Sequence, residues 1–156
     1  EQWSAVPLDR DLLQWDKPDS NPVVSEATFH PAQIGEWRDP FIFSEGGHTY
    51  MLTGGMQDGH GIVPIFRAID AELTKWEFRG VFFQHRTTGS VECPNIAKVG
   101  NKWVLFVSVE GRVEAHVGVI DDRAMRFTSE HEQPVLEGAY ASQLMPKPNG
   151  DHVYLG

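Results

Sequence analysis

The chain has 156 residues, a formal net charge of −9 and 40% hydrophobic residues. Its length fits a single domain, and its acidic balance argues against nucleic acid or an anionic membrane as partner. The sequence shows neither a run of about 18 apolar residues nor a charged leader followed by an apolar stretch,. We therefore expect no membrane span or signal peptide here, and the sequence leaves the compartment undetermined.

Cysteine and histidine usage argues against a metal centre. A single cysteine, Cys93, excludes an internal disulfide and a cysteine-rich zinc site,. The seven histidines are scattered, and the closest polar groupings, Asp58 with His60 and residues 130–132, lack the helical spacing typical of zinc ligands,. We predict no metal ion and no organic cofactor.

Short apolar runs dominate the chain, and they predict strands rather than helices. The runs are rich in β-branched and aromatic residues and are bounded by Gly, Pro, Asn and Asp,. Glycine-containing turns at 45–47, 100–101 and 149–150 are typical of hairpins,. The predicted strands form two sets of four and a partial third: 40–43, 48–53, 62–68 and 76–81; 95–99, 102–109, 114–120 and 125–128; 139–145 and 152–155.

An internal repeat accompanies these sets of strands. Residues 39–50 align without a gap on residues 92–103, at an offset of 53 (92 − 39), and a third copy begins at Gln143, a further 51 residues on (143 − 92). A second marker agrees, because residues 11–15 resemble residues 72–76, with a looser version at 122–127. A period of about 50 residues that holds four antiparallel strands is typical of a β-propeller blade.

We therefore predict an all-β fold in which one partial propeller domain covers residues 1–156. A closed propeller needs at least about four blades, so the chain is expected to be a piece of a longer protein. The expected units are an outer strand within 1–20, blades at 37–82 and 90–130, and the beginning of another blade at 138–156. A small, complete β-sandwich is the alternative, but it would not explain the gapless match.

The repeat also indicates where chemistry would occur. Inner strands of successive blades begin near the propeller axis, so Asp39, Glu92 and Gln143, which share one repeat position, are expected to face one pocket. Two carboxylates at one pocket are what glycoside hydrolysis requires. Plainer interpretations remain open: Asp-Pro often begins a turn, Glu92 could be an ordinary strand-edge carboxylate, and Arg38 could form a surface ion pair.

Four local sequences resemble motifs of glycoside hydrolase family 32, the β-fructofuranosidases, invertases and fructanases. Trp-Arg-Asp-Pro at 37–40 resembles the family's Arg-Asp-Pro motif, and Glu-Cys-Pro-Asn at 92–95 resembles its Glu-Cys motif. Tyr-Ala-Ser-Gln at 140–143 resembles the corresponding segment of the next blade, and 11–15 resembles an Asp-Leu-x-x-Trp outer strand. The resemblance covers nearly the whole chain and implies a five-bladed propeller, of which this chain would supply about two complete blades and parts of two others.

The resemblance implies a role for each matching residue. Glu92 would act as general acid and then general base, and Asp39 would stabilise the transition state. Arg38 would bind the fructosyl unit close to Glu92. Because a guanidinium favours a charged carboxylate, burial and nearby carboxylates would have to raise the pKa of Glu92. The resemblance further implies substrate binding by Tyr140 and Gln143, with Cys93 as an auxiliary buried neighbour.

One departure from the family concerns the nucleophile, an Asp in an Asn-Asp-Pro motif. No Asn-Asp-Pro occurs in the chain, so we expect the motif to precede Glu1 and the chain alone to be inactive as a hydrolase. The expected substrate is sucrose or a fructan, and hydrolysis and fructosyl transfer remain alternatives. The expected protein partner is the remainder of the propeller, or another copy through exposed blade faces.

Two other functions are compatible with the same sequence. One is a related five-bladed glycosidase that acts on arabinan or xylan, since such enzymes also place carboxylates on inner strands. The other is a propeller that binds carbohydrate without cleaving it, because Asp39 and Arg38 could hold a sugar without any nucleophile. The Glu-Cys-Pro sequence at 92–94 favours the fructosidase.

Overall fold

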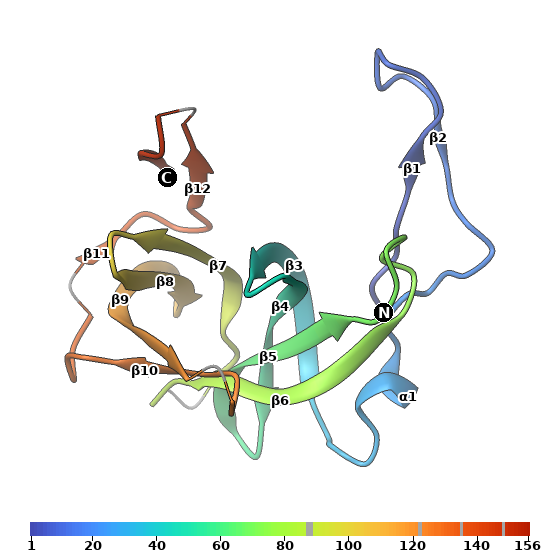
Figure 1. Ribbon diagram of the computed structural model, residues 1–156. Helices are drawn as coiled ribbons and strands as arrows, with labels where there is room; N and C mark the ends of the chain where they lie inside the picture. Colours follow the sequence, from blue (N-terminus) through green and yellow to red (C-terminus); the bar gives the residue numbers. More distant parts are fainter. Residues whose placement is uncertain (87–88, 122, 135, 148) are drawn as a thin grey trace.

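The computed structural model describes residues 1–86, 89–121, 123–134, 136–147 and 149–156. Strands make up most of the regular structure of these residues, and the one helix among them, α1 (Glu26–Phe29), is short. Figure 1 shows two twisted sheets that stand next to each other, with a two-stranded ribbon beyond each of them. No helix in the described ranges is long and apolar enough to cross a membrane.

The first sheet is a four-stranded antiparallel meander in chain order. The predicted strands at 40–43, 48–53, 62–68 and 76–81 are confirmed, and each of them is longer in the structure. The hairpin between the first two strands contains Gly46 and Gly47, both at positive φ, which glycine adopts without a steric penalty,. Its strands are β3 (Gly35–Glu45), β4 (His48–Gln57), β5 (His60–Ala68) and β6 (Trp76–Gln84).

The second sheet repeats this meander, except that its outer edge is made of two short strands. The four predicted strands are confirmed, whereas the fifth, which pairs with the first half of the third strand, was not predicted. The strands are β7 (Glu92–Val99), β8 (Lys102–Val109), β9 (Arg112–Asp121), β10 (Arg126–Ser129) and β11 (Leu136–Gly138).

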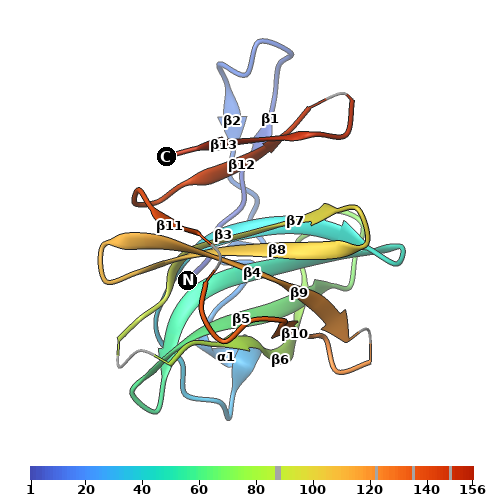
Figure 2. The same ribbon diagram turned by 90° about the vertical axis from the view of Figure 1, so that its left-hand side faces the viewer.

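A two-stranded ribbon lies beyond each sheet, and Figure 2 shows both ribbons on the same side of the two sheets. At the C-terminal end β12 (Gln143–Pro146) pairs with β13 (His152–Leu155). The prediction of a strand over 139–145 was therefore correct in type but began four residues too early. At the N-terminal end β1 (Val6–Pro7) pairs with β2 (Trp15–Asp16).

The resemblance between residues 11–15 and 72–76 is confirmed as a shared local structure. Leu12 and Leu73 have φ angles of 58° and 57°. Three residues further on, the indole N–H of Trp15 donates to the Leu12 carbonyl at 2.8 Å, and that of Trp76 donates to the Leu73 carbonyl at 3.0 Å. The looser third version begins at residue 122, which lies outside the described residues.

The first halves of the inner strands β3 and β7 contain the same β-bulge, and this corrects the predicted repeat. The four residues 38–41 of β3 lie opposite only three residues of β4, 52–54, and the four residues 92–95 of β7 lie opposite only three residues of β8, 106–108. The second residue of each segment has positive φ, 57° at Asp39 and 46° at Cys93. The bulges match at an offset of 54 (92 − 38), so the predicted offset of 53 was wrong by one residue.

The one-residue difference between the predicted and observed offsets has a physical explanation. A shift of one residue turns a strand's side chains to the opposite face of its sheet. The sequence match paired Leu52 with Leu105, and both are fully buried in the cluster between the two sheets. They reach this cluster from opposite faces of their own sheets. At an offset of 54 Leu52 corresponds to Phe106, which packs against Leu144 of the following ribbon.

The third copy of the repeat is displaced further. A left-handed residue comparable with Asp39 and Cys93 occurs at Ala141, with φ 55°. Tyr140, and not Gln143, therefore holds the position that Glu92 holds in β7, at an offset of 48 (140 − 92). The predicted equivalence of Gln143 with Glu92 was wrong for this reason.

A buried side chain joins the second sheet to the C-terminal ribbon. Asn95, which is 1% exposed, donates from Nδ2 to the carbonyls of Cys93 at 3.1 Å and Ser142 at 3.0 Å. Its Oδ1 accepts from the Leu144 N–H at 3.2 Å. Since β7 and β12 belong to different sheets, this amide supplies polar contacts that strand pairing does not.

Candidate active site

Three side chains, one from β3, one from β7 and one from the segment before β12, meet at the beginning of β7. Arg38 Nε donates to Glu92 Oε1 at 3.1 Å, and Arg38 Nη2 donates to the same oxygen. The Tyr140 hydroxyl donates to the other carboxylate oxygen, Glu92 Oε2, at 2.7 Å. Both oxygens of Glu92 are therefore engaged, one by a cation and one by a phenol.

Asp39 lies directly beside this group. The Cys93 backbone N–H donates to Asp39 Oδ2 at 3.0 Å, and the Cys93 thiol lies 3.5 Å from the same oxygen. Asp39 and Cys93 both have positive φ and lie within the bulges of β3 and β7. The structure thus holds a second carboxylate against the residue next to Glu92.

The guanidinium of Arg38 is held by a further contact that the sequence did not indicate. Arg38 Nη1 donates to the Glu36 carbonyl at 2.9 Å, and the Glu36 carboxylate lies 3.8 Å away. The side chains of Arg38 and Glu92 are 42% and 22% exposed, so the ion pair remains open to solvent. Screening by water makes such a pair a modest source of stability, and its main effect is to orient the two groups.

The ionisation of Glu92 differs from the expectation. The hydrogen bonds from Tyr140 and Arg38 lower its pKa, and they outweigh burial, which raises it,. The prediction that burial and carboxylates raise this pKa was therefore wrong for this chain. A general acid needs a proton near neutral pH, so Glu92 in this arrangement is set up as an anion and hydrogen-bond acceptor.

The surroundings of Cys93 keep its thiol protonated. Burial, together with the neighbouring Asp39 carboxylate, raises the pKa of its thiol to about 11. A thiol that stays protonated at neutral pH is a poor nucleophile. Its backbone N–H, rather than its sulfur, makes the closer contact with Asp39.

Gln143 and Gly54 differ from the sequence prediction in their relation to Glu92. Gln143 begins β12 as an exposed residue and, in the part of the chain that the structure describes, takes no part in the hydrogen bonds around Glu92. Gly54 in β4 was not singled out, yet a Cβ at this position would lie 2.2 Å from the Val91 carbonyl oxygen and 2.9 Å from the Cα of Glu92. Glycine at this position allows the chain that carries Glu92 to approach the first sheet.

Comparison with known proteins gives the same family as the motifs. The model of the glycosyl hydrolases family 32 N-terminal domain matches residues 1–156. The chain belongs to this family. It is 31% identical to a sucrose-6-phosphate hydrolase of Lactococcus lactis over 103 residues, which are 64% of this chain and 20% of that protein. It is 32% identical to an insoluble β-fructofuranosidase of Daucus carota over 111 residues, which are 68% of this chain and 18% of that protein.

Solved structures show the same fold. A family 32 β-fructofuranosidase of Bombyx mori superposes with a TM-score of 0.74 at 23% identity over 90% of this chain and 33% of that chain. Fructan 1-exohydrolase IIa of Cichorium intybus gives a TM-score of 0.72 at 18% identity over 94% of this chain and 32% of that chain. The fold is thus part of a five-bladed β-propeller. The chain spans about a fifth of the curated relatives' length and a third of the solved chains.

Proposed function

We propose that this chain forms the acid/base side of the active site of a retaining β-fructosidase. Glu92 is the general acid and base, Asp39 stabilises the transition state, and Arg38 binds the fructosyl unit. The observation that carries the proposal is the convergence of Arg38, Glu92 and Tyr140 from β3, β7 and the segment before β12, with Asp39 held next to them. A pair of carboxylates at one sugar site is the equipment of glycoside hydrolysis.

The names of the relatives support a proposal for the substrate class. One structure of the Bombyx mori enzyme is of a variant in complex with sucrose, and the other relatives are named for sucrose phosphate, fructofuranosides or fructan. We propose a terminal fructosyl unit of sucrose or a fructan as the group that is cleaved or transferred. Tyr140 contributes its hydroxyl to this site, whereas Gln143, which lies outside the Glu92 group, contacts the part of the substrate beyond the cleaved bond.

The lowered pKa of Glu92 sets a requirement on this mechanism. Protonation of the leaving oxygen needs a Glu92 that keeps its proton, and a second carboxylate nearby would provide this because two close anions raise each other's pKa. In a retaining glycosidase the attacking carboxylate lies about 5–5.5 Å from the acid. The chain has no Asn-Asp-Pro sequence to supply it, so the complete site requires a carboxylate from another part of the enzyme.

Glu92→Gln in the protein at its native length tests the assignment. We expect kcat for sucrose to fall about 10²- to 10⁴-fold, the usual contribution of general acid–base catalysis. A nitrophenyl fructoside has a leaving group that needs no proton, so formation of the fructosyl-enzyme should be largely preserved with it. Equal losses in this step and in sucrose turnover would mean that Glu92 has only a structural role.

The matched control is Glu77→Gln, which removes a carboxylate that pairs with Arg67 and Arg79 on β5 and β6. It should leave turnover of sucrose unchanged. Assays with arabinofuranoside and xyloside substrates separate the fructosidase from the related arabinan and xylan enzymes. Activity on these substrates without activity on sucrose or 1-kestose would replace the proposal.

A second candidate function is carbohydrate binding without hydrolysis. The observation in its favour is that Arg38 and Tyr140 hold Glu92 as an anion, which suits hydrogen bonding to sugar hydroxyls better than proton donation. Calorimetric titration with sucrose and 1-kestose, combined with a turnover assay, distinguishes the two functions. Binding that Asp39→Asn abolishes, in a protein that releases no fructose, would support the binding function.

A further inference from the structure

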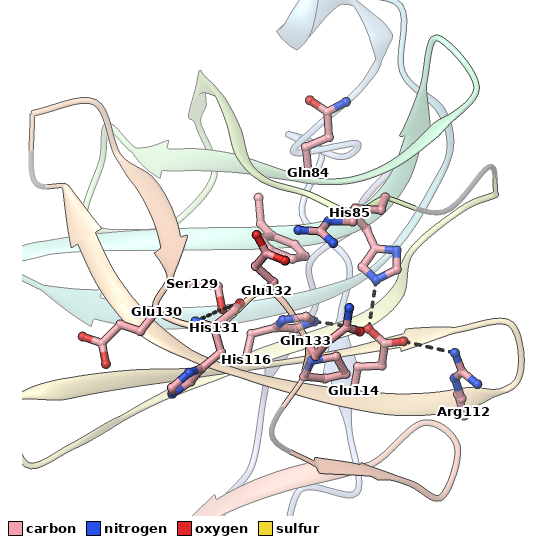
Figure 3. Close-up of a pocket in the computed structure, with 13 residues that line it drawn as sticks. Gln84, His85, Arg112, Glu114, His116, Ser129, Glu130, His131, Glu132 and Gln133 are labelled. Carbon is pink, nitrogen blue, oxygen red and sulfur yellow. Dashed lines mark hydrogen bonds and ion pairs between the residues drawn. The ribbon is translucent and has the colours of Figure 1, made fainter.

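A second polar cluster lies between the two sheets and shares no residue with the Glu92 group. His85 follows the end of β6, and Glu114 and His116 lie two residues apart on β9. Figure 3 shows the three side chains pointing toward one another. His85 Nε2 lies 2.9 Å from Glu114 Oε2, and His116 Nε2 lies 3.3 Å from the same oxygen.

The cluster is buried, which makes its polarity costly. Glu114 is 3% exposed and His116 is 5% exposed, and the side chain of His85 is 15% exposed. Within the described part of the chain, His116 Nε2 has no partner with acceptable hydrogen-bond geometry, although it is close to Glu114. A buried polar nitrogen without a hydrogen bond and a buried carboxylate are both unfavourable unless another group compensates them.

The spacing of the three atoms matches that of ligands around one ion. Zinc binds imidazole nitrogen at about 2.0–2.1 Å and carboxylate oxygen at about 2.0–2.2 Å, which separates tetrahedral ligand atoms by about 3.3 Å. Two of the distances here are 2.9 and 3.3 Å, and all the ligand atoms lie within 4.8 Å of one another. A small adjustment of these side chains would bring all three atoms within reach of one cation.

The surroundings also suit a metal site. Arg112 Nη2 lies 3.6 Å from Glu114 Oε1, the oxygen that does not face the histidines. A group on that oxygen orients the carboxylate, as outer contacts of metal ligands commonly do. The Phe83 ring packs 5.0 Å from the His116 ring and restricts its movement. A cavity of about 450 Å³ adjoins the cluster, with His131 and Glu132 in its wall.

We propose that His85, Glu114 and His116 bind one divalent metal ion of the zinc class, with water from the adjoining cavity as a further ligand. Two imidazoles and one carboxylate form a donor set that zinc accepts. The ion would join the end of β6 in the first sheet to β9 in the second sheet. Its role is therefore to fix the two blades relative to each other rather than to take part in fructosyl chemistry.

Metal titration of the native-length protein tests this proposal. After dialysis against a chelator, Zn²⁺ is added in competition with a chromogenic chelator at pH 7.5. We expect one ion per chain with micromolar or tighter affinity, and at least tenfold weaker binding in Glu114→Gln and in His85→Gln. Co²⁺ in place of Zn²⁺ should give the visible absorption of a four-coordinate site, which Glu114→Gln removes.

Two controls keep the result unambiguous. His60→Ala removes an exposed histidine at the beginning of β5 and should leave the affinity unchanged. Circular dichroism checks each variant, and His85→Gln serves if Glu114→Gln fails to fold, because His85 is less buried. Absence of tight Zn²⁺ binding to the wild-type protein would overturn the proposal. So would equal affinity in the wild type, Glu114→Gln and His85→Gln, and the cluster would then be a hydrogen-bonded His–Glu–His group.

Discussion

The beginnings of β3 and β7 have the same backbone but carry different chemistry. Each has a β-bulge, a left-handed residue within it and a proline directly afterwards. In β3 the two residues before the proline are Arg38 and Asp39, and in β7 they are Glu92 and Cys93. The repeat therefore preserves a conformation and changes the functional group at each position. As a result a cation meets an anion at the first position, and a carboxylate meets a peptide N–H at the second.

The largest expected difference between the two bulges concerns catalysis. Asn tolerates positive φ, so Asp39→Asn and Cys93→Asn should both keep the fold. In the native-length protein we expect Asp39→Asn to lower kcat/KM for sucrose about 10²- to 10³-fold, the size of losing one group that stabilises the transition state. Cys93→Asn should change it less than about tenfold. Equal losses would contradict the assignment of Asp39.

A second difference concerns how closely the two inner strands approach. Gly54→Ala places a Cβ 2.2 Å from the Val91 carbonyl oxygen, so β7 must move away from the first sheet. We expect urea unfolding to show a loss of about 1–3 kcal/mol, as for other overpacked sites, together with reduced turnover. The matched control is Gly55→Ala, whose nearest contact is a side-chain carbon of Ile34 at 3.1 Å. A loss in Gly55→Ala as large as in Gly54→Ala would show that the close approach is unimportant.

The ion pair between Arg38 and Glu92, which joins the two bulges, has a smaller and pH-dependent effect on the stability of the fold. Because Arg38 lowers the pKa of Glu92, Arg38→Met should raise it, which carboxyl NMR titration measures. A carboxylate with a lowered folded-state pKa stabilises the fold above its ordinary pKa, about 4.3, and loses this contribution as pH falls through the folded-state value. The variant should therefore lose less than about 1 kcal/mol at pH 7, and nothing at pH well below both values.

Arg79→Met is the control for this measurement, because Arg79 pairs with Glu77 on the same strand, away from Glu92. It should leave the pKa of Glu92 unchanged. If Arg38→Met also left it unchanged, the ion pair would have no electrostatic effect on Glu92.

The smallest effect concerns the thiol of Cys93. Asp39 is the second contribution, after burial, to the raised pKa of this cysteine. Asp39→Asn should therefore lower that pKa somewhat and increase the rate of iodoacetamide alkylation near pH 8. The change is expected to be modest because burial remains. A slower rate in the variant would mean that Asp39 does not contact the thiol in solution.

The sequence predicted the strands well because they depend on local patterns. β-Branched and aromatic runs between turn residues are sufficient to locate β4, β5, β8 and β9,. The fragment β11 was missed because only three residues pair, and their pairing depends on β9 rather than on their own composition. Helix α1 has only four residues, which is too short to show a period.

The register of the repeat could not be predicted from the sequence. The sequence alignment paired Leu52 with Leu105 because the two side chains are the same. In the structure they belong to different sheets and reach one hydrophobic cluster from opposite faces of those sheets. The strand pairing, through the bulge and the hairpin that follows it, shows that Arg38, and not Asp39, corresponds to Glu92. Sequence similarity recognises residue types, whereas blade equivalence depends on strand pairing and on the sign of φ.

The candidate sites were predicted unequally. The motifs led to Arg38, Asp39 and Glu92, but the direction of the pKa shift of Glu92 depends on distances that only the fold supplies. The cluster of His85, Glu114 and His116 was not predicted, because its spacing differs from that of zinc ligands on a helix. Glu114 and His116 are two residues apart, which is the spacing of one face of a strand,. His85, the third member, lies 29 residues before Glu114 and could not be linked to it without the sheets.

The contacts of Asn95 bear on how such proteins can evolve. Its amide donates and accepts as a peptide group does, so a single side chain takes the place of one rung of a strand ladder between separate sheets. A unit that carries this asparagine can bind its neighbour wherever the neighbour has a backbone carbonyl and a backbone N–H that are not used in strand pairing.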